Sequence, residues 1–179
     1  ANNSYAAREL PADFDTGWRF GLDMAEGTKT KSGVLFAATV PEIQSRVLAY
    51  FGRIGVYAAV NKVRTGVLVS WLPFYTLLNS LFGTGAFNKR VDAAALASPE
   101  DFRRGILAGY LAGDGGYSRR RAMVKVYAGS RSCQLISDMC FLCSTLGIDT
   151  TRTEYQVIGK PFYVMTVRCE DTHRLPMTG

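Results

Sequence analysis

One stretch of the sequence reads Gly105-Ile-Leu-Ala-Gly109-Tyr-Leu-Ala-Gly113-Asp114-Gly115, with a glycine at every fourth position and an acidic residue before the final glycine. A second stretch, 88 residues earlier, reads Gly17-Trp-Arg-Phe-Gly21-Leu-Asp-Met-Ala25-Glu26-Gly27. The small residues at every fourth position and the acid of one stretch have counterparts in the other at this offset. The sequence therefore predicts two copies of one structural unit, since similarity at a fixed spacing is the signature of an internal repeat.

The flanking sequence repeats as well. Helical periodicity over 41–54 and over 130–146 follows the two stretches, and both periodic segments end in an apolar residue followed by Gly and a β-branched residue. Extended runs lie before and after each of these segments. Each half thus reads helix, hairpin, helix, hairpin, and a third helix over 74–82 follows the first half. The predicted fold class is α+β, built from two pseudosymmetric αββαββ(α) repeats.

These patterns also predict the organisation of the chain. We expect an N-terminal tail over 1–16, a first repeat over 17–82, a connector over 83–100 and a second repeat over 101–179. At the same offset, the counterpart of Lys89 in the second repeat would fall near residue 177, where the sequence stops, so we expect no matching lysine and a missing or truncated third helix there.

Glycine inside a helix costs about 1 kcal/mol relative to alanine, so the two glycine stripes require a reason. Small residues at every fourth position allow two helix backbones to approach closely, and we expect Gly17, Gly21, Gly105 and Gly109 to form such an interface. The acids at the ends of the two helices would then meet and repel one another. A divalent cation would relieve that repulsion, and Mg²⁺ uses only one or two carboxylates in addition to water.

The stretch 105–115 resembles the LAGLIDADG signature of homing endonucleases, and its residues 107–109, 114 and 115 match that signature. Residues 19–27 resemble it more loosely and carry Glu26 at the acidic position. The resemblance covers about 17–168 of the chain. It implies a monomer with an antiparallel β-saddle along double-stranded DNA, motif helices at the repeat interface, and hydrolysis of phosphodiester bonds with Mg²⁺ at a long asymmetric target site.

The resemblance also implies roles for individual residues. Glu26 and Asp114 become catalytic metal ligands, and the carbonyl groups of Ala25 and Gly113 become possible helpers. Lys89 matches the basic residue that intein-type members place near the scissile phosphate. Mn²⁺ is expected to substitute for Mg²⁺, and Ca²⁺ to support binding without cleavage.

The charge pattern favours a polyanionic partner. The chain has a net charge of +6 and a sequence pI of about 9.3, and its expected strands hold eleven of the 21 Lys and Arg but two of the 15 Asp and Glu. A basic sheet face is typical of a nucleic-acid binder, although a solvated sheet surface would look the same. The candidate DNA-contacting residues are Lys29, Lys31, Lys62, Arg64, Arg119, Arg121, Lys125, Tyr127 and Arg152.

The cysteine pattern and the apolar segments concern the cellular setting. Three of the four cysteines fall on one expected helix, which is typical of reduced cysteines inside a cell rather than of a disulfide framework. A zinc site from Cys140, Cys143, Cys169 and His173 remains an alternative, but its spacing fits no standard ligand pattern. No signal peptide or membrane span is recognised, so an intracellular protein is expected.

Three alternatives to a nuclease remain open. A DNA-binding module could keep the fold and lose catalysis, but it would gain nothing from two facing acids. An RNA maturase of the same fold is hardly distinguishable by sequence. The segment 163–174 faintly resembles a block near the C-terminal splice site of inteins, but no splicing nucleophile at the start or His-Asn at the end is present, so self-splicing is not expected.

Overall fold

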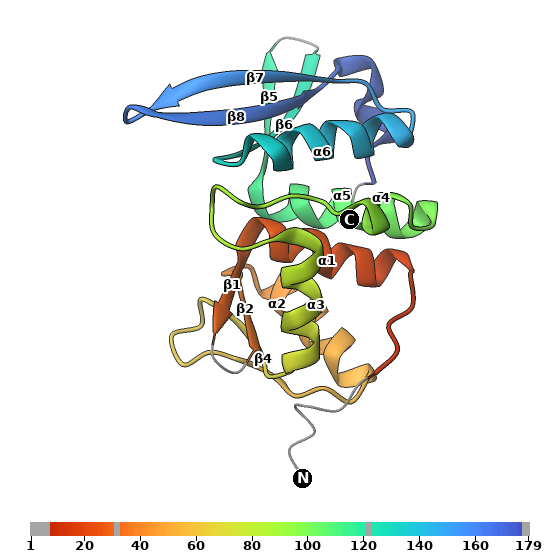
Figure 1. Cartoon of the computed structure of the whole chain (residues 1–179), viewed down its shortest axis with the longest axis vertical. Helices are drawn as coiled ribbons and strands as arrows, with labels where there is room; N and C mark the ends of the chain where they lie inside the picture. Colours follow the sequence, from red (N-terminus) through yellow and green to blue (C-terminus); the bar gives the residue numbers. More distant parts are fainter. Residues whose placement is uncertain (1–7, 31–32, 121–122, 177–179) are drawn as a thin grey trace.

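The computed structural model describes residues 8–30, 33–120 and 123–176, apart from the side chains of Lys29, Arg120 and Met123. Figure 1 shows two halves stacked on one another, with helices α1 and α5 side by side between them. The first half contains α1 (Phe14–Glu26), β1 (Gly27–Thr30), β2 (Gly33–Ala37), α2 (Pro41–Arg53), β3 (Ala58–Val60), β4 (Gly66–Val69) and α3 (Leu72–Phe82). The second contains α5 (Glu100–Asp114), β5 (Gly115–Arg120), β6 (Met123–Ser130), α6 (Cys133–Thr145), β7 (Thr150–Val157), β8 (Lys160–Val167) and η1 (Cys169–Arg174), and α4 (Ala93–Leu96) lies between the halves.

The two halves have the same sheet topology. Their antiparallel strands follow the orders β1-β2-β4-β3 and β5-β6-β8-β7. The first hairpin of each half begins with an equivalent pair: Gly27 pairs with Phe36 in the first half, and Gly115 pairs with Ala128 in the second. This architecture confirms the predicted α+β class and the pseudosymmetric repeat. Helix α1 begins at Phe14, slightly before the expected start of the first repeat at residue 17.

Close packing between α1 and α5 joins the two halves. A Cβ atom added to any of four glycines on these helices would overlap a backbone carbonyl oxygen of the other helix. The contacts are reciprocal about a pseudo-twofold axis, so that only glycine fits at this distance. They join Gly17 to Phe102, Gly21 to Ile106, Gly105 to Phe14 and Gly109 to Trp18.

The glycines that end the two helices have another role. Gly27 and Gly115 fit helix C-caps, but both adopt extended backbone angles (φ −74° and −78°) and not the left-handed conformation of a typical glycine cap. Each donates its N–H to a carbonyl one turn earlier, of Asp23 or Leu111, and starts the next strand directly. A Cβ at either position would overlap that same turn, so close approach, not a positive φ, requires glycine here.

The halves differ in what covers the helix side of the sheet. In the first half α3 places Phe74 against Phe20, Phe36 and Phe51, with ring centroids 5.2–6.5 Å apart. In the second half the 3₁₀ helix η1 follows β8 as α3 follows β4, and it is shorter than α3.

Within the described residues, no helix has the length and apolar character needed to cross a bilayer.

Candidate metal centre and nucleic-acid interface

The acids of the two motifs lie together where α1 and α5 end. The space that a Cβ of Gly113 would occupy is filled by the Cβ of Ala25 and by the Cγ of Glu26, which lies 2.9 Å from that position. Glu26 therefore contacts the residue just before Asp114. Because the small-residue stripes bring the helices into contact along their length, carboxylates 88 positions apart in sequence become neighbours.

The surroundings of Asp114 disfavour its charged form. Although the residue as a whole is exposed, partial removal of water from the carboxylate raises the pKa of Asp114 to about 6. The ammonium group of Lys89 opposes this rise, and the carboxylate of Glu26 adds to it. The helix C-termini at which both acids lie also carry partial negative charge, which adds to the demand for a cation at this place.

Lys89 reaches this centre from the connector between the halves. Its ammonium group donates a hydrogen bond of 2.5 Å to the carbonyl oxygen of Met24 in the last turn of α1. Its own carbonyl oxygen accepts a hydrogen bond from the hydroxyl group of Ser132, the N-cap of α6. The connector is thereby attached to both halves, and Lys89 lies beside the paired acids.

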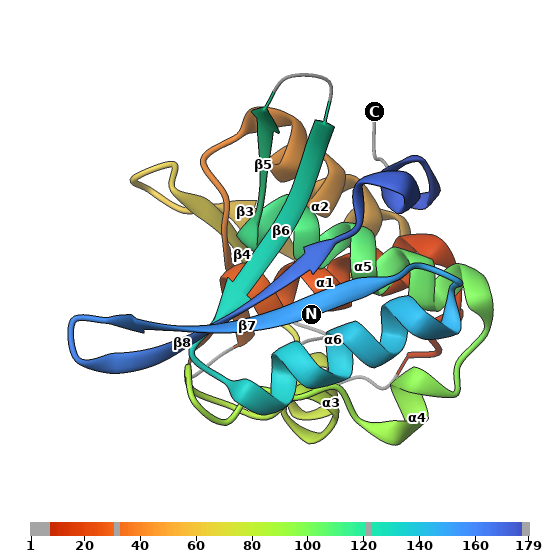
Figure 2. The ribbon, with the colours of Figure 1, turned by 90° about the horizontal axis from the view of Figure 1, so that it is seen from above.

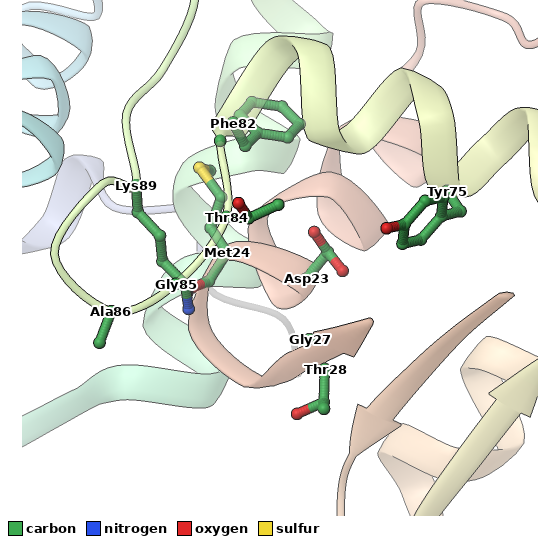
Figure 3. Close-up of a pocket in the computed structure, with 11 residues that line it drawn as sticks. Asp23, Met24, Gly27, Thr28, Tyr75, Phe82, Thr84, Gly85, Ala86 and Lys89 are labelled. Atoms are coloured by element: carbon green, nitrogen blue, oxygen red, sulfur yellow. Dashed lines mark hydrogen bonds between the residues drawn. The ribbon is translucent and has the colours of Figure 1, made fainter. Parts of the chain in front are cut away.

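A cavity of about 470 Å³ opens next to Lys89 (Figure 3). The end of α1, the start of β1, the end of α3 and the connector line it, and the carboxylate of Asp23 points into it (Figure 3). Sequence reasoning did not identify Asp23, although an acid on an otherwise apolar helix face was a visible signal. Asp23 is buried and stands where the second motif has Leu111, so the two halves differ beside the acids.

Two carboxylates suit a hard divalent cation. Mg²⁺ keeps several of its waters and commonly uses one or two protein carboxylates together with the phosphate groups of its substrate. The pair of Glu26 and Asp114 supplies this number and kind of donor. By contrast, the described residues contain no group of three or more His, Cys, Asp or Glu that would hold a metal, so the alternative zinc site from Cys140, Cys143, Cys169 and His173 is wrong.

The sheet faces turned away from the helices form the candidate DNA surface. In the second sheet, the buried Met165 and Val167 mark the helix side, and the pairing of Tyr127 with Thr166 puts these residues on the outer side. Lys125 lies on the same outer side, since it is two positions from Tyr127. Both Lys125 and Tyr127 are exposed, and the Tyr127 ring lies over Gly116.

Two of the basic candidates lie on the other side of this sheet. Arg119 pairs with Val124 and lines a groove on the helix side, and Arg152 pairs with the buried Met165. The guanidinium group of Arg152 donates a hydrogen bond of 2.5 Å to the hydroxyl group of Ser137 in α6. The register of the strands directs these two arginines towards the helices and not to the outer face, so their position does not favour the predicted contact with DNA.

The remaining candidates belong to turns or are not described. Lys62 and Arg64 are exposed in the turn between β3 and β4. Lys31, Arg121 and the side chain of Lys29 lie outside the described residues. The outer face of the first sheet is neutral among the described side chains, with Leu35, Leu68 and Ala59 in one row.

Comparison with known sequences finds a family model that matches the second half. Residues 101–175 match the family model described as LAGLIDADG-like domain. The chain is 25% identical over 158 residues to the DNA-directed RNA polymerase subunit Rpo1C of Methanocaldococcus jannaschii, and 28% identical over 127 residues to a DNA polymerase of Thermococcus sp.. These matches cover 86% and 70% of this chain but only 18% and 7% of the two relatives, so the chain spans a small part of their length.

Comparison with solved structures concerns the whole chain. The homing endonuclease I-DmoI in complex with DNA and Mn has a TM-score of 0.62 at 11% identity, covering 94% of this chain and 99% of that one. Full-length DUF199/WhiA from Thermatoga maritima has a TM-score of 0.64 at 10% identity, covering 95% of this chain and 56% of that one. Residues 101–175 are therefore similar to the LAGLIDADG-like domain, and the chain as a whole shares the fold of I-DmoI and of DUF199/WhiA.

Proposed function

We propose that this protein is a site-specific endonuclease that hydrolyses double-stranded DNA with a divalent metal ion, Mg²⁺ in the first place. The observation that carries the proposal is the contact between the two motif ends, which brings Glu26 and Asp114 together from positions 88 residues apart. A protein that only binds DNA gains nothing from such a pair, because facing carboxylates lower its stability.

Each part of the centre has a role in this proposal. Glu26 and Asp114 would hold the metal, with the carbonyl groups of Ala25 and Gly113 as helpers. A bound divalent ion supplies a water of lowered pKa and stabilises the leaving oxygen of the phosphodiester. Lys89, fixed at the end of α1 by the carbonyl oxygen of Met24, would place its positive charge beside the scissile phosphate.

The two sheets would hold the DNA. A major groove admits a two-stranded β-ribbon, and side chains on the outer faces can reach the base edges there. Lys125 and Tyr127 face outward on the second sheet. Lys62 and Arg64, in a turn of the first half, would contact phosphates and so position the DNA backbone. Because one chain carries both motifs, we propose that it acts as a monomer on a long, asymmetric site.

The relatives support this proposal through their names and their lengths. I-DmoI, described as a homing endonuclease, has been solved with DNA in the presence of Mn, Ca or Mg. The two sequence relatives are named for polymerases, but the matched segment is a small part of each. We infer that the matched segment is an inserted endonuclease unit, as found in inteins, and that the polymerase activity belongs to the rest of those proteins.

Cleavage of a randomised duplex library tests the proposal. The full chain is incubated with the library and Mg²⁺, and the ends produced are sequenced; parallel reactions contain Mn²⁺, Ca²⁺ or a chelator. We expect cuts at one family of sequences with Mg²⁺ or Mn²⁺, and binding alone with Ca²⁺. Asp114→Asn and Glu26→Gln should bind the same sequences and leave them uncut. Full cleavage by both variants would contradict the assignment of the metal centre.

A further inference from the structure

The hairpin formed by β7 and β8, residues 150–167, extends beyond the body of the second half (Figure 2). We call it the β7–β8 arm. Every residue of β7 after Thr150 is exposed, and Arg131, which follows β6, reaches the far part of the arm with a hydrogen bond to the carbonyl oxygen of Val157. A long exposed ribbon is a liability for aggregation unless a ligand or partner uses it. Its surface therefore requires a functional account.

The residue at the tip of the arm, Ile158, has a backbone conformation that is unfavourable for its side chain. Ile158 has a φ of +53° and is 92% exposed. A β-branched side chain is disfavoured in this left-handed region, where hairpin turns normally use Asn, Asp or Gly. The other described non-glycine residue with a positive φ is Arg64, in the equivalent turn of the first half. Thus one turn presents a charged side chain and the other an apolar one, at a local cost in stability.

The outer face of the arm is also apolar. Tyr155 pairs with Phe162 and lies on the outer side together with Val157, and these two β7 residues are 53% and 39% exposed. Among the described residues of β7 and β8, Lys160, paired with Val157, is the single charged residue on this face, and the guanidinium group of Arg131 lies over the Phe162 ring. The acidic Glu154 lies on the opposite side, paired with Tyr163. The face combines exposed apolar groups with a positive charge and no acid.

This face continues the candidate DNA surface without a break. β8 lies between β7 and β6, and Thr166 on its outer side is paired with Tyr127 of β6 and with Thr151 of β7. A duplex held over Lys125 and Tyr127 therefore extends along the arm towards its tip. The position, the charge and the apolar character together point to double-stranded DNA as the occupant.

We propose that the β7–β8 arm recognises thymine. In the major groove thymine alone among the four DNA bases presents a methyl group, and apolar side chains contact it. Tyr155, Val157 and Ile158 would pack against thymine methyl groups in the outer part of the half-site bound by the second repeat, and Lys160 would attract the backbone. This inference rests on the proposed binding of duplex DNA but not on cleavage.

Replacing thymine by deoxyuridine tests the inference, because it removes the methyl group and preserves base pairing. The full chain selects a duplex from a randomised library with Ca²⁺, and the affinity is then measured after single T→U changes along the site. We expect a loss of about three- to five-fold for each contacted methyl group in the outer half-site. In Ile158→Asn this sensitivity should disappear at the outermost thymine and persist nearer the centre.

The variant and its control separate recognition from folding. Asn tolerates the left-handed conformation, so Ile158→Asn should melt no lower than the wild type while binding the thymine site more weakly. Phe141→Gln removes another exposed apolar group, 57% exposed on α6 and outside the arm, and should leave the affinity unchanged.

Three results would overturn the inference. The first is a selected duplex whose affinity no T→U change in the outer half-site alters. The second is an Ile158→Asn variant that keeps the full methyl sensitivity, or that loses self-association instead of DNA affinity, which would assign the tip to a protein contact. The third is the selection of no duplex at all, which alone would also count against the proposed function.

Discussion

The ammonium group of Lys89 donates its hydrogen bond to the carbonyl oxygen of Met24, which lies in the final turn of α1 just before Glu26. The last carbonyl groups of a helix have no partner within the helix, and the C-terminus favours a cation. The same contact places a positive charge close enough to Asp114 to oppose the rise of its pKa that burial causes. Lys89 thus satisfies a carbonyl group at the helix end and places its positive charge beside the acid pair.

Lys89→Met should slow cleavage more than it weakens binding. Removing one preorganised charge beside the reacting phosphate costs about 100-fold in rate. We expect a loss of that order in single-turnover cleavage with Mg²⁺, with a change in Kd below about tenfold. Arg90→Met is the matched control, since Arg90 is exposed in the same connector and donates to the carbonyl oxygen of Ser80. Equal cleavage rates in the two variants would remove Lys89 from the mechanism.

Asp114→Asn should stabilise the metal-free protein at neutral pH. The folded chain raises the pKa of Asp114 to about 6 from an ordinary value of 3.8, so the folded state holds this proton more tightly than the unfolded state does. The contribution of Asp114 to the free energy of unfolding therefore falls as the pH rises from about 4 to about 6. For this exposed carboxyl group, solvent screening reduces the expected effect to about 1 kcal/mol.

Urea unfolding with a chelator, at pH 4.5 and at pH 7.5, measures this effect. The free energy of unfolding of Asp114→Asn should exceed that of the wild type at pH 7.5 and approach it at pH 4.5. Glu9→Gln, which changes an exposed acid before α1, gives the background of a general charge change. A variant that is equally destabilised at both pH values would contradict the raised pKa.

Some of these features could be predicted from the sequence because they depend on local spacing. The glycine stripes and the acids that follow them are local patterns, and their repetition at one offset implied the pairing of Glu26 with Asp114. The side of the sheet taken by Arg119 and Arg152 could not be predicted in this way. It depends on which strand residues pair, and a shift by one residue reverses every side chain. The cavity beside Asp23 likewise forms only when α1, α3 and the connector come together.

The glycine packing between the motif helices gives a prediction with an internal control. Gly109→Ala places a Cβ against the backbone of Trp18, which cannot move without separating the helices, so a loss of about 2–3 kcal/mol is expected. Gly52→Ala, inside α2, meets no atom within 4 Å and should gain about 1 kcal/mol from higher helix propensity. Thermal and urea melts of both variants test this pair. A Gly109→Ala protein as stable as the wild type would rule out the tight contact between α1 and α5.

The salt dependence of DNA binding distinguishes the two sides of the second sheet. Lys125 is exposed on the outer side, where its charge would neutralise one DNA phosphate. Lys125→Ala should therefore weaken binding and reduce the slope of log K against log salt by about 0.9. Arg152 lies on the helix side and donates to Ser137, so Arg152→Ala should leave the slope unchanged while lowering the melting temperature slightly. Both measurements use the selected duplex with Ca²⁺, over a series of salt concentrations. Both variants remove one positive charge from the same sheet, so the comparison isolates the side on which the charge lies. If Arg152→Ala reduced the slope and Lys125→Ala did not, the DNA would lie on the opposite side of the sheet from the proposed one.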